Sequence, residues 1–389
     1  MSSGFNLFRD WIDISPIQTG QFTTISVEGL VPDNATGVIL RVANQTWKAR
    51  ACVRKIGSSL NPDWFQLMRH AHAFAFCGLD DLKFEAWCEN LSYASFNGNP
   101  VKIYLCGYTD EAVGFLPELV QTTDCSSLVP SEATGGIWLV YSSHPTTGRS
   151  FAIKGYGSTD KHYNSDLYGG HATHIVSIDA ECNSFIYALV AFGEGKKIHF
   201  RDRSGDGFVK PYLIGYTKPP VHFFLNSILK SPTESGNWHK IDMPELPAEA
   251  DGIILEIRNT APGRKALSTR EIGSTNDSAF SNLGLETAIW DTCGITDGGF
   301  EAWVDWKEKA MFFIHGYTIP EGTLAEFPCP YCSEVFATQQ ELDDHIANEH
   351  PQPTDTITIE SGVLEGDVTI SGSHISIDIA FGHIEGEIS

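Results

Sequence analysis

A short apolar and aromatic run that ends in Gly-Tyr-Thr occurs three times in this chain of 389 residues. Aromatic and β-branched residues favour strands, so each run is typical of a buried strand that closes a β domain. The copies recur at a spacing of roughly 100 residues, which indicates one structural unit used three times. The three copies read IYLCGYT (103–109), YLIGYT (212–217) and FFIHGYT (312–318).

The stretches before the first and third copies share further landmarks in the same order. Each has an opening with Trp and Asp, a strand after a turn, a strand that ends in Gly-Ser, and an aromatic strand that contains Glu-Ala-Trp. The second stretch is more divergent and carries an insertion at 194–207. The matched pairs are 11–14 with 238–242, 35–44 with 250–259, 51–59 with 268–275, and 84–87 with 299–303.

The apolar residues in these runs either alternate or form short continuous blocks, as in strands that are covered on one or both faces. We therefore predict an all-β fold of three tandem β-sandwich modules with a jelly-roll-like topology. The expected boundaries are 1–118, 119–226 and 227–320. The composition changes after Thr318, because residues 310–389 contain no Lys or Arg.

One motif in the C-terminal part has metal-ligand spacing. Cys329 and Cys332 are followed after twelve residues by His345 and after four more by His350, as in a tetrahedral zinc site of two thiolates and two imidazoles. Residues 327–350 resemble a two-Cys, two-His zinc finger, and the resemblance implies a bound Zn²⁺ in a small ββα knuckle at 321–351. Phe336 and Leu342 occupy the expected core positions.

The same resemblance does not extend to DNA binding. Fingers of this family read bases from the start of their helix, supported by Arg and Lys on phosphates. Here that segment, 337–344, holds three acids and no base. The whole chain has 26 basic and 49 acidic residues, a net charge of −23 that repels phosphate backbones. A zinc-finger regulator of nucleic acid is therefore disfavoured, and a structural role for the zinc is expected.

The last segment, 352–389, alternates strongly between apolar and polar residues and predicts short β-strands. A piece of this size cannot form a stable core alone, so we expect it to act as an oligomerisation arm. The start of the chain shows no signal peptide, and no stretch is apolar for long enough to span a membrane. Nine cysteines, mostly in apolar runs, indicate reduced, buried thiols, although Cys52, Cys88 and Cys106 could pair if oxidised.

For the other candidate sites, an ordinary structural role is a better explanation than a functional one. His70 and His72 lie on one face of a strand but lack a third ligand, and His171 with His174 is no stronger. The segment 202–207 resembles a calcium loop without its bidentate acid, so we interpret it as a turn. The recurring Gly-Ser turn is interpreted as a feature of the fold, and most tryptophans as core, with Trp306 the most exposed. No nucleophile elbow, metalloprotease, P-loop or dinucleotide motif occurs, so no enzyme is predicted.

The modules at 10–318 loosely resemble repeated β-sandwich modules of phage and viral structural proteins. The resemblance implies a non-enzymatic virion structural protein, assembled in the host cytoplasm, that contacts itself and other virion proteins. Its expected place is capsid decoration, a fibre or a turret-like component. The alternative is a glycan-binding surface adhesin or lectin built of the same β-sandwich repeats. Neither hypothesis involves nucleic acid or a membrane.

Overall fold

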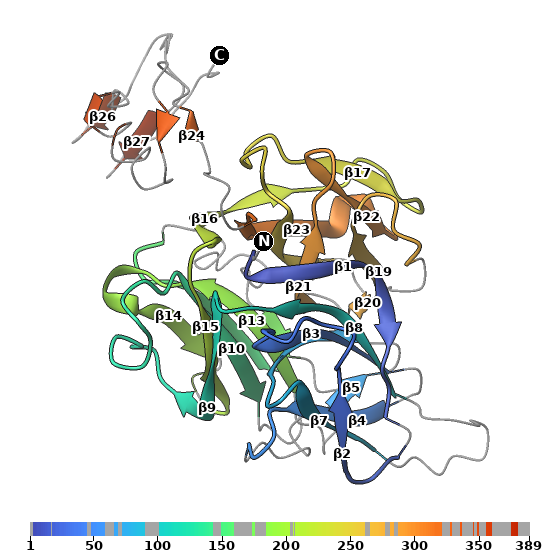
Figure 1. Cartoon of the computed structure of the whole chain (residues 1–389). Helices are drawn as coiled ribbons and strands as arrows, with labels where there is room; N and C mark the ends of the chain where they lie inside the picture. Colours follow the sequence, from blue (N-terminus) through green and yellow to red (C-terminus); the bar gives the residue numbers. More distant parts are fainter. Residues whose placement is uncertain are drawn as a thin grey trace. The chain divides into compact units, whose positions relative to one another are not determined.

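The protein is described here from a computed structural model in which β-strands make up nearly all the regular structure (Figure 1). The chain divides into two compact units, 1–323 and 324–389. The structure describes residues 3–16, 18–44, 48–58, 66–68, 72–89, 101–142, 149–158, 173–175, 184–202, 205, 207–260, 265–276, 281–283, 287–320, 327–328, 335–336, 345, 348–349, 355–359 and 375–379.

The strands of residues 5–109, which we call module 1, form two four-stranded antiparallel sheets with the strand order of a jelly roll. The first sheet has the order β1-β8-β3-β6 and the second β2-β7-β4-β5. The strands are β1 (Phe5–Asp13), β2 (Phe22–Ser26), β3 (Gly37–Asn44), β4 (Lys48–Arg54), β5 (Gln66–Met68), β6 (His72–Gly78), β7 (Lys83–Cys88) and β8 (Val101–Thr109).

Module 3, residues 221–318, repeats this topology strand for strand. Its sheets have the orders β16-β23-β18-β21 and β17-β22-β19-β20. A short 3₁₀ turn, η4 (Lys307–Lys309), precedes the last strand. The strands are β16 (Val221–Lys230), β17 (His239–Asp242), β18 (Gly252–Asn259), β19 (Lys265–Arg270), β20 (Ser281–Leu283), β21 (Thr287–Gly294), β22 (Gly299–Val304) and β23 (Ala310–Thr318).

Module 2, residues 113–217, has the same first sheet, in the order β13-β10-β15-β9, but its second sheet has only three described strands, β12-β11-β14. No strand of the described chain occupies the position that β2 and β17 hold beside β7 and β22. The elements are β9 (Val113–Gln121), β10 (Gly135–Ser142), β11 (Arg149–Gly155), β12 (Thr173–Ile175), β13 (Ser184–Ala191), η3 (Glu194–Lys196), β14 (Ile198–Asp202) and β15 (Val209–Thr217).

The strands correct three details of the sequence interpretation. The module boundaries expected after residues 118 and 226 fall inside β9 and β16. The modules in fact meet earlier, at 110–112 and 218–220, because β9 pairs in the sheet of module 2 and β16 in that of module 3. The match of 11–14 with 238–242 is wrong, because Trp11 lies in the first strand of its module and His239–Asp242 is the second strand of module 3. The segment 194–207 is no simple insertion, since it contains β14, the counterpart of β7.

The Gly-Tyr-Thr motif has a structural cause in each module. Its glycine lies opposite a bulge in the module's first strand, and a Cβ on Gly215 would stand 2.7 Å from the backbone oxygen of Gly114. Gly107 and Gly316 face the backbone oxygens of the first strand in the same way. Only glycine allows such a close backbone approach. The threonine is buried and forms a hydrogen bond just before the strand β3, β10 or β18, which begins with a glycine. In module 1, for example, Thr109 Oγ1 lies 3.0 Å from Oγ1 of Thr36, the residue before β3.

The second unit contains two described strand pairs. The strands β24 (Phe327–Pro328) and β25 (Val335–Phe336) form a short antiparallel pair, and residues 345, 348 and 349 are helical. The strands β26 (Asp355–Ile359) and β27 (Ile375–Ile379) pair in parallel. Among the helices of the described residues, none is both long and apolar enough to cross a bilayer.

Candidate functional site: the junctions between modules

The Gly-Ser turn of module 3 contacts the first strand of module 1. Ser274 Oγ donates to the backbone oxygen of Arg9 at 2.7 Å, and Thr275 donates to Asp10 Oδ1 from its backbone N–H at 2.9 Å and from Oγ1 at 2.8 Å. Arg9 Nη2 returns a bond to the backbone oxygen of Ile272 at 3.0 Å. The hydrogen bonds from Thr275 lower the pKa of Asp10.

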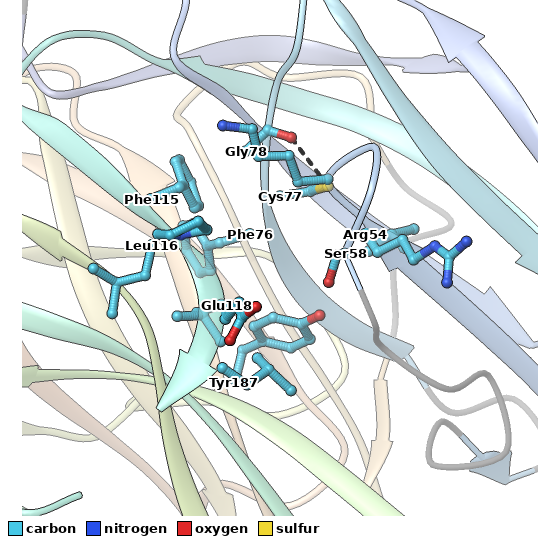
Figure 2. A pocket seen from close by; sticks show the side chains of 14 residues that line it. Arg54, Ser58, Phe76, Cys77, Gly78, Phe115, Leu116, Glu118 and Tyr187 are labelled. Atoms are coloured by element: carbon cyan, nitrogen blue, oxygen red, sulfur yellow. Dashed lines mark hydrogen bonds between the residues drawn. The ribbon is translucent and has the colours of Figure 1, made fainter. Parts of the chain in front are cut away.

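Equivalent residues make the other two junctions. Between modules 2 and 3, Ser158 Oγ donates to Asn226 Oδ1 at 2.9 Å. Between modules 1 and 2, Ser58 and Glu118 line the same narrow cleft (Figure 2). Asp10, Glu118 and Asn226 hold one structural position, since each lies in the bulge of the first strand of its module. The turn of each module therefore meets the first strand of the next, and the third module meets the first.

Close packing of a glycine against a large apolar residue recurs at the same junctions. A Cβ on Gly37 would collide with the ring of Phe115, and a Cβ on Gly135 with the ring of Phe223. At the third junction a Cβ on Gly252 would be 3.4 Å from Leu7 Cδ1. The three glycines begin equivalent strands, β3, β10 and β18. The three junctions thus form a closed cycle, which we call the module ring.

The strands β6, β13 and β21, one from each module, contact one another in pairs where the modules meet. The neighbouring strands β3, β10 and β18 are buried at every residue, because one face packs in their own sandwich and the other against the adjoining modules. One apolar cluster joins modules 1 and 2 and includes Ile254 and Trp290 of module 3. Modules 1 to 3 are accordingly one packed body, held mainly by buried apolar surface.

A buried pair of opposite charges, Arg41 of module 1 and Asp291 of module 3, also lies where the modules meet. Arg41 is 1% exposed, donates from Nε to His72 Nδ1 at 2.7 Å, and stacks over the Trp11 ring at 4.7 Å. Asp291 is 2% exposed and accepts from Thr269 Oγ1 at 2.6 Å. Burial raises the pKa of Asp291 to about 6 although the Arg41 charge opposes the rise, and burial lowers the pKa of Arg41 to about 10.

At the position equivalent to Arg41, module 3 carries Glu256. Arg258 Nη2 donates to Glu256 Oε1 at 2.8 Å, and His315 Nε2 lies 3.5 Å from Glu256 Oε2. Burial acts to raise the pKa of Glu256, but Arg258 and His315 outweigh it, and the pKa falls to about 2. Charged groups are costly inside a protein unless they are paired, so these residues favour one specific alignment of the modules.

The cleft between modules 1 and 2 is too small for an organic ligand. It is lined by residues such as Phe76, Phe115 and Tyr187 and has a free volume of about 40 Å³ (Figure 2). That is room for a few water molecules at most, whereas small-molecule sites usually measure several hundred Å³. Within the described ranges, no three His, Cys, Asp or Glu side chains are grouped so that they could hold a metal ion.

The weaker sequence candidates have structural explanations where they are described. His72 accepts the bond from Arg41, while His70 and His171 lie outside the described residues and His174 is known only as part of the β12 backbone. Asp202 Oδ2 accepts the Gly207 N–H at 3.0 Å, as in a turn, and Asp206 is not described. Six described cysteines are buried thiols: Cys52, Cys77, Cys88, Cys106, Cys125 and Cys293. Trp306 is 40% exposed, as predicted.

The predicted zinc ligands fall largely outside the description. Cys329, Cys332 and His350 are among the residues that the structure does not describe, and His345 is helical. The Phe336 ring lies 4.6 Å from the His345 ring, and the β24–β25 pair brackets the two cysteines in sequence. The zinc site therefore stays a prediction from the sequence.

Sequence reasoning missed the part that the Gly-Ser turns play in the module ring. Their recurrence was visible, but the counterpart positions Asp10, Glu118 and Asn226 share no residue type. The mismatch of Trp11 with Trp238 also hid the equivalence of the three first strands. The signal that was available is the repeated serine itself, because a turn needs glycine but does not need a hydroxyl beside it.

Comparisons with known proteins were made for the whole chain. No family model matches it, and no curated protein matches it in sequence. Among solved structures, a chain from the atomic structure of Sulfolobus Turreted Icosahedral Virus is similar at 10% identity, with 82% of this chain and 91% of that chain covered and a TM-score of 0.17. A second, from work on the triple jelly-roll fold and turret assembly in an archaeal virus, has 9% identity, the same coverage and a TM-score of 0.16. Similarity at these TM-scores carries no weight for function.

Proposed function

We propose that this protein is a non-enzymatic structural component of a virion, in the role of capsid decoration, fibre or turret, and that it associates with itself and with other virion proteins. The observation that carries the proposal is the module ring. One chain joins three jelly rolls through equivalent contacts around a cycle, as a symmetric trimer does with three chains. Such a body is suited to a place in a symmetric assembly.

The chemistry of the described residues supports a structural role over catalysis. The buried Glu256 is paired with Arg258 at 2.8 Å, and burial raises the pKa of the thiols, as at Cys125, where it reaches about 12. A catalytic cysteine needs the opposite shift, since the thiolate is the nucleophile. The cleft of Figure 2 is too small for a substrate.

Zinc forms part of the same proposal. Cys329, Cys332, His345 and His350 would hold one Zn²⁺ and give the short 321–351 segment the stability that its few apolar residues do not supply. The tail at 352–389 would then follow a fixed knuckle and contact another copy. The acidic surface, with a net charge of −23, suits a protein that packs with proteins and avoids nucleic acid.

The test is the mass of the purified protein by light scattering after size exclusion, with and without a zinc chelator. We expect a defined oligomer of the 42.7 kDa chain, and we expect deletion of residues 354–389 to reduce it to the monomer of the shortened chain. An unchanged oligomer after the deletion would show that the segment 352–389 does not mediate self-association. A monomer under all conditions would contradict self-association.

A glycan-binding adhesin or lectin is the second candidate, and one observation favours it. Trp306 is exposed, and Lys265 Nζ lies 5.3 Å from the centre of its ring, so an aromatic face and a cation are presented together at the surface. Sugars stack on exposed aromatic rings of this kind. Binding on a glycan panel that Trp306→Ala abolishes would establish this function, and no binding by the folded protein would exclude it.

A further inference from the structure

The two strands of the C-terminal tail pair in parallel at one constant offset. Every pair joins residues twenty apart in sequence, from Asp355 with Ile375 to Ile359 with Ile379, and the pairs are consecutive. Parallel neighbours need a connection that carries the chain back to the same end of the sheet. Each residue of β27 therefore lies beside the residue that precedes it by one complete return of the chain.

The sequence repeats at the same offset beyond the two strands. Residues 357–369 are ITIESGVLEGDVT and residues 377–389 are IDIAFGHIEGEIS. Both segments have two alternating isoleucines, a glycine three residues later, and a Glu-Gly step followed by an acid and a β-branched residue. A sequence period that equals the strand offset is typical of a β-solenoid, in which equivalent residues of successive coils stack. The repeat therefore predicts two stacked coils, beginning at residues 355 and 375.

Two coils are too few for a stable stack. Among the described residues, β26 and β27 form a sheet of two strands only. Such a sheet is marginal in water, and repeat folds need about three or more units to bury a continuous core. An unguarded strand edge also pairs readily with a strand of another chain. The tail should therefore gain stability when further strands join its sheet.

The edge of β27 is the better place for such an addition. The rest of the chain enters the tail at β26, through the segment Pro351-Gln352-Pro353, whereas β27 lies one coil further along. A strand that adds beside β27 is thus farther from this entry point than one that adds beside β26. The β27 sequence, Ile-Ser-Ile-Asp-Ile, has no lysine or proline and only one charged residue to guard its edge.

We propose that a second copy of this chain supplies the missing strands, and that β27 pairs with β27 of that copy, antiparallel about a twofold axis at Ile377. In this arrangement Ile375 lies opposite Ile379, and Asp378 lies opposite Ser376, so no two acids face each other. The isoleucines stay on one face, because side chains alternate along a strand. The product is a closed pair with a four-stranded sheet, the isologous contact of most homodimers. The inference rests on the self-association proposed above and names the contact made by its arm.

Disulfide trapping tests this contact in the full chain. Chains carrying Ser376→Cys are mixed with chains carrying Asp378→Cys and oxidised, and the wild-type chain is oxidised alongside to give the background from its native thiols. A link between the two variants is the expected result, because opposite Cα atoms of an antiparallel pair are about 4.5–5.5 Å apart, within disulfide range. Either variant alone should link far less, since its two cysteines would be diagonal neighbours about 7–8 Å apart.

A matched control uses the pairing within the tail. Thr356→Cys and Ser376→Cys in one chain should give a link inside that chain, because the two residues are paired in the β26–β27 ladder. Chains with Thr356→Cys alone, mixed with chains with Ser376→Cys alone, should give no link between copies. Such a link would require head-to-tail stacking of the coils or exchange of a strand.

A charge substitution gives a second test that does not depend on oxidation. Ser376→Asp puts an acid opposite Asp378 twice in the twofold pair, so association should weaken about fivefold. Thr356→Asp adds the same charge at the equivalent position of the first coil and should change association little. Ser376→Asp combined with Asp378→Ser removes the facing acids and should restore association. Equal weakening by Thr356→Asp would contradict the proposed contact.

The outcomes separate this contact from self-association itself. A link between Thr356→Cys and Ser376→Cys chains, with none between Ser376→Cys and Asp378→Cys chains, would overturn the twofold arrangement. Oligomers by light scattering with neither link would overturn β27 as the contact and leave self-association standing. Monomers throughout would overturn both. No link inside the chain that carries both Thr356→Cys and Ser376→Cys would contradict the stacking of the coils.

Discussion

Thr275 and Asp10 are 265 residues apart in sequence, and Thr275 gives Asp10 Oδ1 two hydrogen bonds, from its backbone N–H and from its hydroxyl. These bonds join the third module to the first and complete a cycle whose other contacts run from module 1 to 2 and from 2 to 3. A cycle has no terminal module, so each module is supported on two sides. Loss of one junction should therefore loosen the other two.

Asp10→Ala should open the junction between modules 3 and 1. The substitution leaves Thr275 N–H and the Thr275 hydroxyl without their acceptor, so β1 should exchange amide hydrogens faster and be cut sooner by protease. Hydrogen bonds lower the pKa of Asp10 in the folded protein. Its contribution to the stability of the junction is therefore present at neutral pH and is lost as the pH falls through this lowered pKa. Hydrogen exchange at pH 7 measures the effect.

The matched control for Asp10→Ala is Asp81→Ala. Asp81 is an exposed acid paired with Lys83 of its own module, so it loses the same charge without touching a junction. Equal exchange of β1 in both variants would show that the Thr275–Asp10 contact does not hold the modules together.

Gly37→Ala should destabilise the junction between modules 1 and 2 by about 2 kcal/mol, because the added methyl meets the Phe115 ring and the core cannot expand without strain. Denaturant titration measures the free energy of unfolding. Phe115→Leu removes part of the ring, so the double variant should lose less than the sum of the two single variants. The Cys77 carbonyl oxygen, 2.8 Å from the new Cβ, keeps the rescue incomplete. If the losses of the two single variants simply added up in the double variant, the strain of Gly37→Ala would not come from the Phe115 ring.

The parts of the fold that sequence could predict are those with local patterns. The Glu-Ala-Trp strands at 85–87 and 301–303 were matched correctly, because alternation places their apolar residues on one face. The bulged first strands were not matched, since the bulge breaks the alternation between Leu7 and Ile12. The junction residues have no local pattern at all, as their partners lie in other modules. The zinc ligands are the reverse case, since their motif is sharp and local, and the site stays a prediction.

The buried Asp291 should make stability depend on pH in a window that the surface acids do not share. Its folded pKa of about 6 exceeds the unfolded value of 3.8, so the folded state holds the proton more tightly. Stability from this group therefore falls as the pH rises from 3.8 through 6, by about 3 kcal/mol in total. Glu256, whose pKa is lowered to about 2, acts in the opposite direction and only at lower pH.

Asp291→Asn isolates this dependence. Because the amide cannot ionise, the variant should not carry the cost of the buried carboxylate at pH 7, and its free energy of unfolding should no longer decline between pH 4 and pH 7. Asp242→Asn, an exposed acid on β17, serves as the control and should keep the wild-type decline. The same decline in Asp291→Asn as in the wild type would show that another group titrates there.

Removal of zinc should affect the second unit and spare the first. We expect about one zinc per chain by elemental analysis, lost in Cys329→Ser and kept in Cys125→Ala, since Cys125 is a buried thiol of module 2. Chelation should unfold 327–350, because the short β24–β25 pair and one Phe336–His345 contact bury too little apolar surface to fold without the metal. The near-ultraviolet signal of the buried Trp138 and Trp290 should persist. Full zinc content in Cys329→Ser would mean that the metal is held by other residues, and loss of the tryptophan signal on chelation would mean that the module ring itself depends on the metal.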